Sequence, residues 1–277
     1  MFKDGNPMKR VEDAVYLGAS ITREIEPRLE IRRRISMTMP VLKKLDIFWN
    51  KTKCCKAWKI QVLNAVIVSK LIYGLETIEP TAGVSNMLDT FQLKGLRKIL
   101  EMKTTFIDRA NTNQKVYQCA QNLLNTKNLT KKAHNQKPES WLARQVRPLT
   151  MVLEEKKLNM LGHVIRRDFS HPLQQVTFDT AANTRYGRPL AIKEQWGKRR
   201  QGRPRLHWTH ENMRKAWDHI RTQENVVPDN LKTQPYDNKD PEKNKIIAER
   251  ARLYKTPFQG SENIKRFMEE ALQDNEY

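Results

Sequence analysis

The sequence predicts a mainly α-helical protein with a short N-terminal β-hairpin, a helical bundle and a basic helical C-terminal module with flexible segments. Three observations lead to this prediction. Apolar residues recur at helical spacing in three successive stretches between residues 27 and 103. A loosely alternating segment with turn-forming residues precedes them. Charged residues make up 30% of the chain and hydrophobic residues only 38%, so some segments are expected to lie outside a packed core.

The N-terminal residues 1–22 carry the signals of a β-hairpin. The run DGNP at 4–7 is typical of a turn, and the segment after it alternates loosely in polarity and ends at Tyr16, Leu17 and Gly18. A two-stranded sheet alone is marginally stable in water. We therefore expect the remainder of a sheet to lie upstream of the first residue.

Residues 23–110 are predicted to form the bundle, whose first helix begins at Pro27, where the missing N–H of proline costs nothing. Pro40 falls inside the same apolar pattern. It should kink or split the helix, because proline removes one backbone hydrogen bond and crowds the preceding turn. The run RRR at 32–34 is expected on the outer face of this helix.

Two more helices complete the predicted bundle. One runs from about Lys53 to Thr77, and the other runs from about Ser85, a suitable N-cap, to Met102. Helices with short connections pack as a bundle, so their apolar faces are expected to form its core. The expected core residues are Trp58, Val62, Val66, Leu71 and Tyr73 in one helix and Leu88, Phe91, Leu96, Ile99 and Leu100 in the other.

Two segments are predicted to contain little packed structure. Residues 111–140 are predicted to be a linker rich in Asn, Lys and Thr, with one short helix at about 115–125. Residues 221–277 carry several prolines and few apolar residues. They are predicted to be a flexible tail with short helices at about 246–254 and 262–272.

Residues 141–220 are predicted to form the basic helical module. A long helical pattern at 141–167 is interrupted by Pro148, and a further helix is expected at 208–220. Between these helices lies the run GKRRQGRPR at 197–205. Its cations, which are candidate nucleic-acid contacts, are Lys198, Arg199, Arg200, Arg203 and Arg205.

The core of this run, GRP at 202–204, resembles an AT-hook. An AT-hook lays an extended Arg-Pro segment into the narrow minor groove of A·T-rich DNA. Trp196 and Trp208 flank the run, where they could stack on bases, although Trp208 could equally be an ordinary helix anchor. Contact with phosphates of any sequence is the competing interpretation of the run.

The formal net charge of +20 predicts a polyanionic partner, nucleic acid before membrane. A basic protein that binds no nucleic acid is the alternative. The most apolar run, residues 60–75, is interrupted by polar residues and is shorter than the ~20 residues of a membrane-spanning helix. Three cysteines without a CxxC pair exclude a disulfide framework, and the N-terminus lacks a signal peptide. We therefore expect an intracellular protein.

Other catalytic patterns are weak. His207 and His210 have the spacing of metal ligands on a helix, but no third ligand stands near them, so no metal site is predicted. His163 lies in an apolar helical pattern and is expected to be structural. PD at 228–229 and DNK at 237–239 match the string of restriction-like endonucleases, which hold these residues on adjacent strands, but this segment has no strand pattern.

The chain carries a series of short motifs: VYLG at 15–18, EIxxRI at 30–35, SKLIYGxE at 69–76, LRxIL at 96–100, LGHVxR at 161–166 and GKRRxGRPRxxW at 197–208. In their order and spacing they resemble the reverse transcriptases of non-LTR (LINE-like) retrotransposons. The earlier motifs resemble the region just after the palm, and the later ones resemble the C-terminal segment of such reading frames. The resemblance extends over roughly residues 10–220.

The resemblance implies a role for each part. Tyr16, Leu17 and Gly18 would belong to the primer grip, and residues 23 to about 103 would be the thumb, which closes over the template–primer duplex. A thumb holds any sequence, so its cations would contact backbone phosphates rather than base edges. The alternative is that these cations are only solvated surface charges. The candidates are Arg32, Arg33, Arg34, Lys43 and Lys44.

The family's polymerase chemistry needs Mg²⁺ held by carboxylates of the palm. This chain begins at the primer grip and contains no Asp-Asp pair. The parent family is an enzyme, but we expect this chain alone to be inactive and to hold no cofactor, since Mg²⁺ belongs to the missing palm. The implied partners are RNA, DNA or an RNA–DNA hybrid, together with the upstream palm and fingers of the same polyprotein, and not a membrane.

The predicted function is that of a C-terminal fragment of a retrotransposon reverse transcriptase. It would bind template–primer nucleic acid through its helical thumb, in the nucleus or in a cytoplasmic ribonucleoprotein. Two alternatives stay open. One is a standalone, non-catalytic basic protein that binds nucleic acid through the AT-hook-like run. The other is the remnant of a restriction-like endonuclease.

Overall fold

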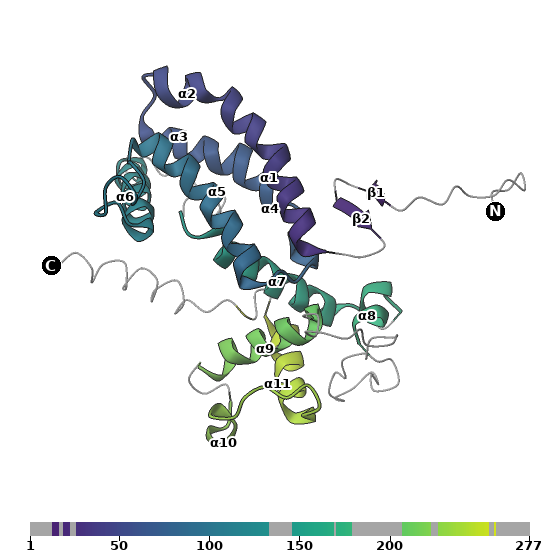
Figure 1. The fold of residues 1–277 in the computed structure, drawn as a ribbon. Coiled ribbons are helices and arrows are strands. Elements are labelled where there is room, and N and C mark those ends of the chain that lie inside the picture. Colours follow the sequence, from purple (N-terminus) through teal and green to yellow (C-terminus); the bar gives the residue numbers. More distant parts are fainter. Residues whose placement is uncertain are drawn as a thin grey trace, which may run out of the picture.

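The chain is mainly helical, as the sequence predicted (Figure 1). None of the helices formed by the described residues is both long enough and apolar enough to cross a membrane. One group of helices lies above α7 (Leu149–Arg166) in Figure 1 and a second group lies around and below it. The computed structural model describes residues 13–16, 19–22, 26–132, 146–168, 170–178, 207–222, 227–254 and 258.

Two short strands precede the helices. β1 (Asp13–Tyr16) pairs antiparallel with β2 (Ala19–Thr22), so that the first residue of β1 lies opposite the last residue of β2. The described part of the chain contains no third strand in this sheet. Residues 17–18, and the turn signal at 4–7, lie outside the described residues.

The first helix of the bundle, α1 (Pro27–Lys44), begins at the expected proline and continues through Pro40. Of the two expected effects of Pro40, a kink or a split, the split does not occur. Ile31 and Leu42, which lie on either side of it, are both buried in the core. The stability gained by packing these side chains offsets the loss of the one backbone hydrogen bond that proline cannot make. The short helix α2 (Asp46–Lys51) follows.

The second predicted helix consists of three joined parts. α3 (Lys56–Val62) continues into the π-helical segment η1 (Leu63–Val68) and then into α4 (Ser69–Ile72). Apolar side chains occupy two sides of this run, and packing against the other helices buries only one side. Three of the predicted core residues are therefore on the wrong side. Trp58, Val66 and Tyr73 are 48%, 42% and 57% exposed, whereas Ile60, Leu63, Ile67 and Leu71 are buried.

Gly74 turns the chain toward the third helix. Its φ of 71° is left-handed, which glycine adopts without strain, and it leads into the 3-10 segment η2 (Leu75–Thr77) and α5 (Ala82–Leu100). The N-cap is Thr81 rather than the predicted Ser85. The Ser85 N–H donates to the Thr81 carbonyl (2.9 Å) and so already belongs to the first helical turn.

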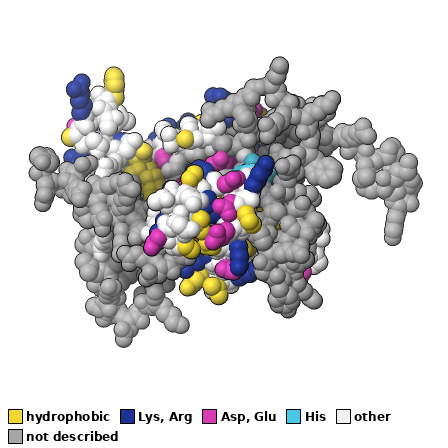
Figure 2. Space-filling view, turned by 90° about the horizontal axis from the view of Figure 1, so that it is seen from below, with side chains coloured by type: hydrophobic (Ala, Val, Ile, Leu, Met, Phe, Trp, Pro, Cys, Tyr) yellow, Lys and Arg dark blue, Asp and Glu magenta, His cyan; other side chains and the backbone are white. Residues whose placement is uncertain are grey.

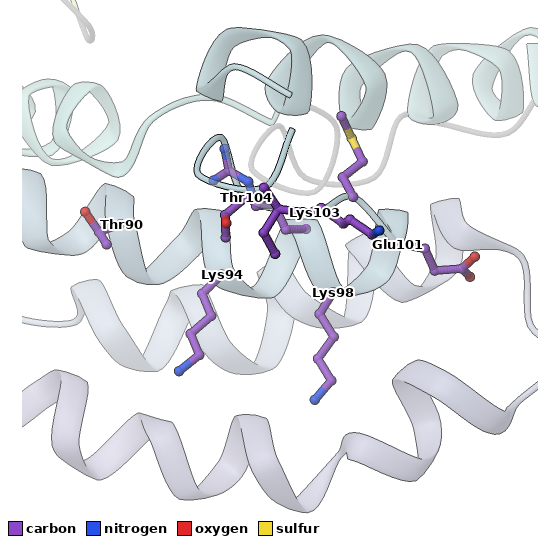
Figure 3. A pocket seen from close by; sticks show the side chains of 9 residues that line it. Thr90, Lys94, Lys98, Glu101, Lys103 and Thr104 are labelled. Carbon is purple, nitrogen blue, oxygen red and sulfur yellow. The ribbon is translucent and has the colours of Figure 1, made fainter. Parts of the chain in front are cut away.

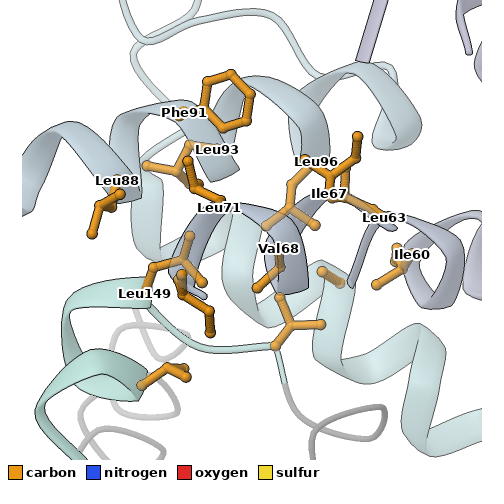
Figure 4. Close-up of a cluster of buried hydrophobic side chains, with 14 of the residues drawn as sticks. Ile60, Leu63, Ile67, Val68, Leu71, Leu88, Phe91, Leu93, Leu96 and Leu149 are labelled. Carbon is orange, nitrogen blue, oxygen red and sulfur yellow. The ribbon is translucent and has the colours of Figure 1, made fainter. Parts of the chain in front are cut away.

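α5 is the central helix of the bundle core. Its leucines pack with Leu63 and Leu71 from the preceding helical run (Figure 4). A Cβ atom at Gly95 would lie 2.9 Å from Leu63 Cδ1, so glycine allows the two helices to approach closely at this position.

The short helix predicted at about 115–125 within the linker is confirmed, and it is longer than expected, because residues 113–132 form the helix α6 (Asn113–Lys132). The Asn- and Thr-rich sequence has only modest helix propensity, so packing against the bundle stabilises this helix. The residues that α6 buries at helical spacing are Val116, Tyr117, Ala120 and Leu124.

α7 joins two hydrophobic cores. It begins directly after Pro148, the proline at which an interruption was predicted. Its residues up to Leu153 belong to the bundle core, and its residues from Leu158 onward belong to a second core. The boundary between the two packed units therefore lies inside α7 and not at the start of the predicted 141–220 module.

Side chains of α5 hold the start of α7. The Asp89 carboxylate accepts hydrogen bonds from the Thr150 N–H (3.0 Å) and from the Thr150 hydroxyl (2.7 Å). The Gln92 amide donates to the Arg147 carbonyl (3.2 Å). Desolvation raises the pKa of the Asp89 carboxyl, although the bonds from Thr150 oppose this shift. The bundle thus supplies the cap that α7 lacks in its own sequence.

Four further helices follow α7 among the described residues, and the last three of them in chain order contribute side chains to the second core. α9 (Trp208–Arg221) confirms the helix predicted at 208–220. α11 (Pro241–Leu253) contains most of the short helix predicted at 246–254, and its Asp240 N-cap accepts from the Glu242 and Lys243 N–H groups. The remaining two helices are α8 (Pro172–Thr177) and α10 (Asp229–Lys232).

The prediction of a flexible segment is wrong for residues 227–245, whereas the short helix predicted at 246–254 lies mostly within α11. Val227 and Leu231 are buried in the second core together with Trp217 of α9, which is fully buried. A few apolar side chains suffice for packing here, because the large indole ring offers each of them a buried contact. The helix predicted at 262–272 lies outside the described residues.

Two buried tyrosines should make the fold sensitive to alkaline pH. Tyr117 donates its hydroxyl to Gln92 (3.0 Å), and Tyr236 donates to Asn244 (2.8 Å). Burial raises the pKa of both phenols above the ordinary value of 10.0, so their contribution to stability is complete below pH 10 and is lost as the pH rises. We expect the free energy of unfolding to fall above pH 10 by up to about 1.4 kcal/mol per pH unit for each tyrosine.

Urea unfolding between pH 8 and pH 11 would measure this slope, with pH values chosen to span the unperturbed phenol pKa of about 10. The variant Tyr117→Phe keeps the ring but has no proton to release. It should therefore show a shallower slope than the unmodified chain, and an unchanged slope would contradict the assignment to Tyr117.

Candidate nucleic-acid interface

One side of α1 carries exposed basic and polar residues along a groove. Arg32, Ser36 and Lys43 lie at helical spacing on this side, and Met87 of α5 closes the groove opposite them. Within the described part of the chain, neither Arg32 nor Lys43 has a carboxylate at ion-pair distance. These two cations are therefore available to a ligand.

A second groove follows the C-terminal half of α5 and the loop after it (Figure 3). Lys94 and Lys98, one helical turn apart, leave α5 on the same side. The two grooves adjoin, because Lys94 Nζ lies 4.0 Å from the Sδ atom of Met39, a residue of the first groove. We call the surface along both grooves the basic face and define it by Arg32, Ser36, Lys43, Thr90, Lys94, Lys98, Lys103 and Thr104.

Two carboxylates beside the basic face are already paired. Lys98 forms an ion pair with Asp46 of α2, and Glu101 lies 3.4 Å from a lysine Nζ of α3. Lys94 and Lys103 are exposed and have no acidic partner among the described residues. Four cations of this surface are therefore left for a polyanion, two from α1 and two from the α5 groove.

The structure separates the three arginines that were predicted as phosphate contacts. Arg32 is exposed on the basic face. Arg33 and Arg34 both bind the Glu30 carboxylate, at 2.9 and 2.7 Å. Burial alone would raise the pKa of the Glu30 carboxyl, but its two arginine partners lower it. Only Arg32 is thus free of this carboxylate.

The placement of Arg34 on the outer face is wrong, because this residue is only 6% exposed. Its partner Glu30 compensates the charge, which makes burial of the guanidinium tolerable. The guanidinium carbon lies 5.8 Å from the centre of the Tyr73 ring, and a Cβ atom at Gly74 would lie 3.6 Å from Nη2. Arg34 therefore supports the turn after α4 instead of facing solvent.

The remaining predicted contacts lie mostly outside the described residues. Tyr16 is the last residue of β1, opposite Ala19, and nothing is described of its side chain. The predicted contacts outside the described part of the chain are Leu17, Gly18, Lys198, Arg199, Arg200, Arg203 and Arg205.

Trp208, which follows the basic run, is held against the bundle. Its indole N–H donates to the Glu76 carbonyl (2.8 Å), and the Asn212 amide, one turn later, donates to the Glu79 carboxylate (3.2 Å). These two bonds connect α9 to the turn between α4 and α5. They favour the helix-anchor interpretation of Trp208 over base stacking.

Glu79 lies in a buried charge cluster that connects the two cores. Its carboxylate accepts a hydrogen bond from Lys157 Nζ of α7 (3.0 Å) and lies 3.6 Å from Lys215 Nζ of α9. The Glu79 and Lys157 side chains are only 6% and 4% exposed. Burial lowers the pKa of Lys157, while Glu79 raises it. This cluster is a structural contact and not part of the interface.

The surface of the second core differs from the basic face. Seen from below, its Lys and Arg side chains lie close to Asp and Glu side chains (Figure 2). On α9, Arg214 pairs with Glu211 (2.9 Å) and with Asp218 (3.3 Å). Charges that neutralise one another locally attract a polyanion only weakly.

The histidine pair does not form a metal centre in the described structure. The rings of His207 and His210 lie edge to face, with centroids 4.7 Å apart, and His210 Nε2 lies 3.4 Å from the Asn238 amide. No group of three His, Cys, Asp or Glu side chains is placed to hold a metal within the described residues. His163 is exposed and accepts from Arg167 Nε (3.1 Å), so it does not pack in a core.

The nuclease string is not assembled on strands. Asp229 lies on α10, is 94% exposed and pairs with Lys232 (2.6 Å). Asp237 caps its own turn by accepting the Lys239 N–H (3.0 Å). The segment thus forms helices and turns, which weighs against the nuclease alternative.

Sequence reasoning missed the α5 half of the basic face. Lys94 and Lys98 have the i, i+4 spacing that places two side chains on one side of a helix. That spacing could have indicated a basic stripe opposite the apolar one. The sequence gives no sign, however, that α1 lies beside α5.

No protein-family model, curated protein or solved structure matches the chain. The resemblance to non-LTR reverse transcriptases therefore rests on the motifs alone.

Proposed function

We propose that this chain binds nucleic acid through the basic face, largely without regard to sequence. One observation carries the proposal: Arg32, Lys43, Lys94 and Lys103 lie on adjoining grooves and have no carboxylate partner among the described residues. Hydroxyl groups between such cations are further donors for phosphate oxygens. The hydroxyls that can donate here belong to Ser36 and Thr104, whereas the Thr90 hydroxyl already donates to the Asn86 carbonyl (2.9 Å).

The arrangement favours phosphate contact over base recognition. Three of the cations lie along the neighbouring helices α1 and α5, and Lys103 lies in the loop after α5, so together they can follow a backbone whose charges repeat along a strand. Contacts of this kind position a duplex without reading its sequence.

The motif resemblance supports a more specific form of this proposal. In it, the helices around α1 and α5 are the thumb of a non-LTR reverse transcriptase, and they hold template–primer nucleic acid. The catalytic carboxylates and their Mg²⁺ would lie in a palm encoded upstream, so this chain alone is expected to be inactive. The nucleus or a cytoplasmic ribonucleoprotein is where such a protein would meet its partners.

Salt dependence tests the general proposal. If four cations each displace a condensed counterion, the logarithm of the affinity for duplex should fall against the logarithm of salt concentration with a slope of about −3 to −4. Fluorescence anisotropy with a labelled RNA–DNA hybrid and with duplex DNA of mixed sequence would measure it. Absence of binding to both at low salt, or a slope near zero, would contradict the proposal.

The AT-hook alternative makes a different prediction for the same assay. A groove-specific contact requires preference for A·T-rich duplex over mixed duplex, and Arg203→Ala should abolish that preference. If Arg203→Ala removes all binding while changes on the basic face remove none, the run at 197–205 and not the basic face is the binding element.

A further inference from the structure

The loop between α5 and α6 presents an aromatic side chain at the end of the basic face. Phe106 is 98% exposed, and its neighbour Ile107 is 66% exposed. A single exposed apolar residue is common on protein surfaces. Phe106 differs from such a residue, because hydrogen bonds order the loop around it and cations border this loop.

The loop is closed at both ends. At its start, Glu101 adopts a left-handed φ of 63°, and the Met102 N–H donates to the Arg97 carbonyl (3.0 Å), which ends α5. At its end, the same Arg97 donates from Nη2 to the Asn111 carbonyl (3.0 Å). One arginine side chain thus connects the end of the loop to the helix on which the basic face lies.

The tip of the loop is a tight turn. The Ile107 and Asp108 N–H groups both donate to the Thr104 carbonyl (3.0 Å each). The Asp108 carboxylate in turn accepts from the Ala110 N–H (3.0 Å) and from the Asn111 amide (3.1 Å). These bonds hold Phe106 at the tip of the loop, where its side chain is 98% exposed.

The surroundings of Phe106 are complementary to nucleic acid. Ile107 lines the same groove as Lys94, Lys98 and Lys103. An exposed aromatic ring next to cations that contact phosphates is the combination found in proteins that stack on bases. A purely hydrophobic protein partner would have to leave these lysines desolvated and unpaired, which is costly.

We propose that Phe106 stacks on an unpaired base at the junction between a duplex, held by the basic face, and a single strand. The inference rests on the proposed function. Bases inside a duplex are already stacked, and opening a step costs a few kcal/mol. An unpaired base offers its ring face without this cost, so the junction is the substrate that an exposed phenyl ring fits best.

The test compares a blunt duplex with the same duplex carrying a short single-stranded overhang, whose first base is 2-aminopurine. The full chain should bind the overhang form more tightly, by roughly 5- to 100-fold, and should quench the 2-aminopurine fluorescence. Phe106→Ala should lose both the preference and the quenching and should keep its affinity for the blunt duplex.

Two further variants separate stacking from other effects. Phe106→Leu keeps an apolar side chain without a ring, so it should behave as Phe106→Ala does. Leu253→Ala changes a side chain that is 76% exposed on α11 and should leave both readouts unchanged. Retention of the overhang preference by Phe106→Ala would overturn the inference and leave the proposed function intact. If the unmodified chain binds neither substrate, the proposed function fails instead.

Discussion

Replacement of Glu79 by leucine is expected to destabilise the fold by about 3–5 kcal/mol, because it leaves a buried lysine without its counter-charge. Lys157 Nζ lies 3.0 Å from the Glu79 carboxylate, and both side chains are almost completely buried. In the variant, Lys157 must either remain charged in a poorly solvated site or lose its proton. Lys215, which is 21% exposed, can turn toward solvent and should add little to this loss of stability.

Unfolding in urea at neutral pH would measure this loss, and the double variant Glu79→Leu, Lys157→Met is the decisive control. Because it removes both buried charges, it should recover most of the stability that Glu79→Leu loses. Asp229→Asn changes a carboxylate that is 94% exposed and should leave the unfolding midpoint unchanged. Equal destabilisation by the single and the double variant would contradict the charge explanation.

The Glu79→Leu variant should also respond to alkaline pH in a defined direction. Burial already places the pKa of Lys157 below the value of 10.5 that a solvated lysine has, so the unfolded chain binds this proton more tightly. The free-energy cost of keeping Lys157 charged in the folded protein is complete below the folded-state pKa. This cost decreases as the pH rises toward 10.5, so the free energy of unfolding increases. Removal of Glu79 lowers the pKa of Lys157 further. The stability of the variant should therefore begin to rise at a lower pH than that of the unmodified chain.

Charge reversal on the α5 half of the basic face is expected to have the second large effect. The double variant Lys94→Glu, Lys103→Glu replaces by anions two groove cations that have no acidic partner within the described part of the chain. We expect the affinity for duplex at about 0.1 M salt to fall by about 10- to 100-fold, and the salt slope to become shallower by about 2. Fluorescence anisotropy across a salt series would measure both quantities.

A matched charge reversal elsewhere provides the control. Lys245 is 54% exposed on α11 and lies 4.0 Å from a Glu249 carboxylate oxygen. Lys245→Glu should change the affinity far less than a single reversal at Lys94. If all reversals weaken binding equally, the net charge of +20 and not the basic face accounts for the interaction.

Local signals predicted helix starts well and the ends of packed regions poorly. The starts at Pro27 and Trp208 follow from a proline in the first turn and from an apolar pattern, which depend only on nearby residues. The length of α6 and the packing of residues 227–245 were mispredicted, since the few apolar side chains of these segments are buried against other helices. Composition measures how many apolar residues a segment has and not what covers them.

The candidate site was predictable only in part, for the same reason. The sequence identifies Arg32, Arg33 and Arg34 as equal candidates, and the structure leaves one of them free, because Glu30 binds the other two. Phe106 had no place in the predicted interface. The position of its loop beside the α5 groove, which Ile107 lines, depends on the turn at Thr104 and on the Arg97 bond that connects the loop to the helix.

By itself the sequence determined the helical class of this protein, its strong positive charge and several helix boundaries, since these follow from composition and from interactions within one or two turns. Only the tertiary structure decided which helix faces are buried and which cations remain unpaired. The pair Lys98–Asp46 joins residues 52 apart in the sequence, and the pair Lys157–Glu79 joins residues 78 apart. The partners of a charge are set by how the helices pack, and a sequence pattern of one helix does not contain that information.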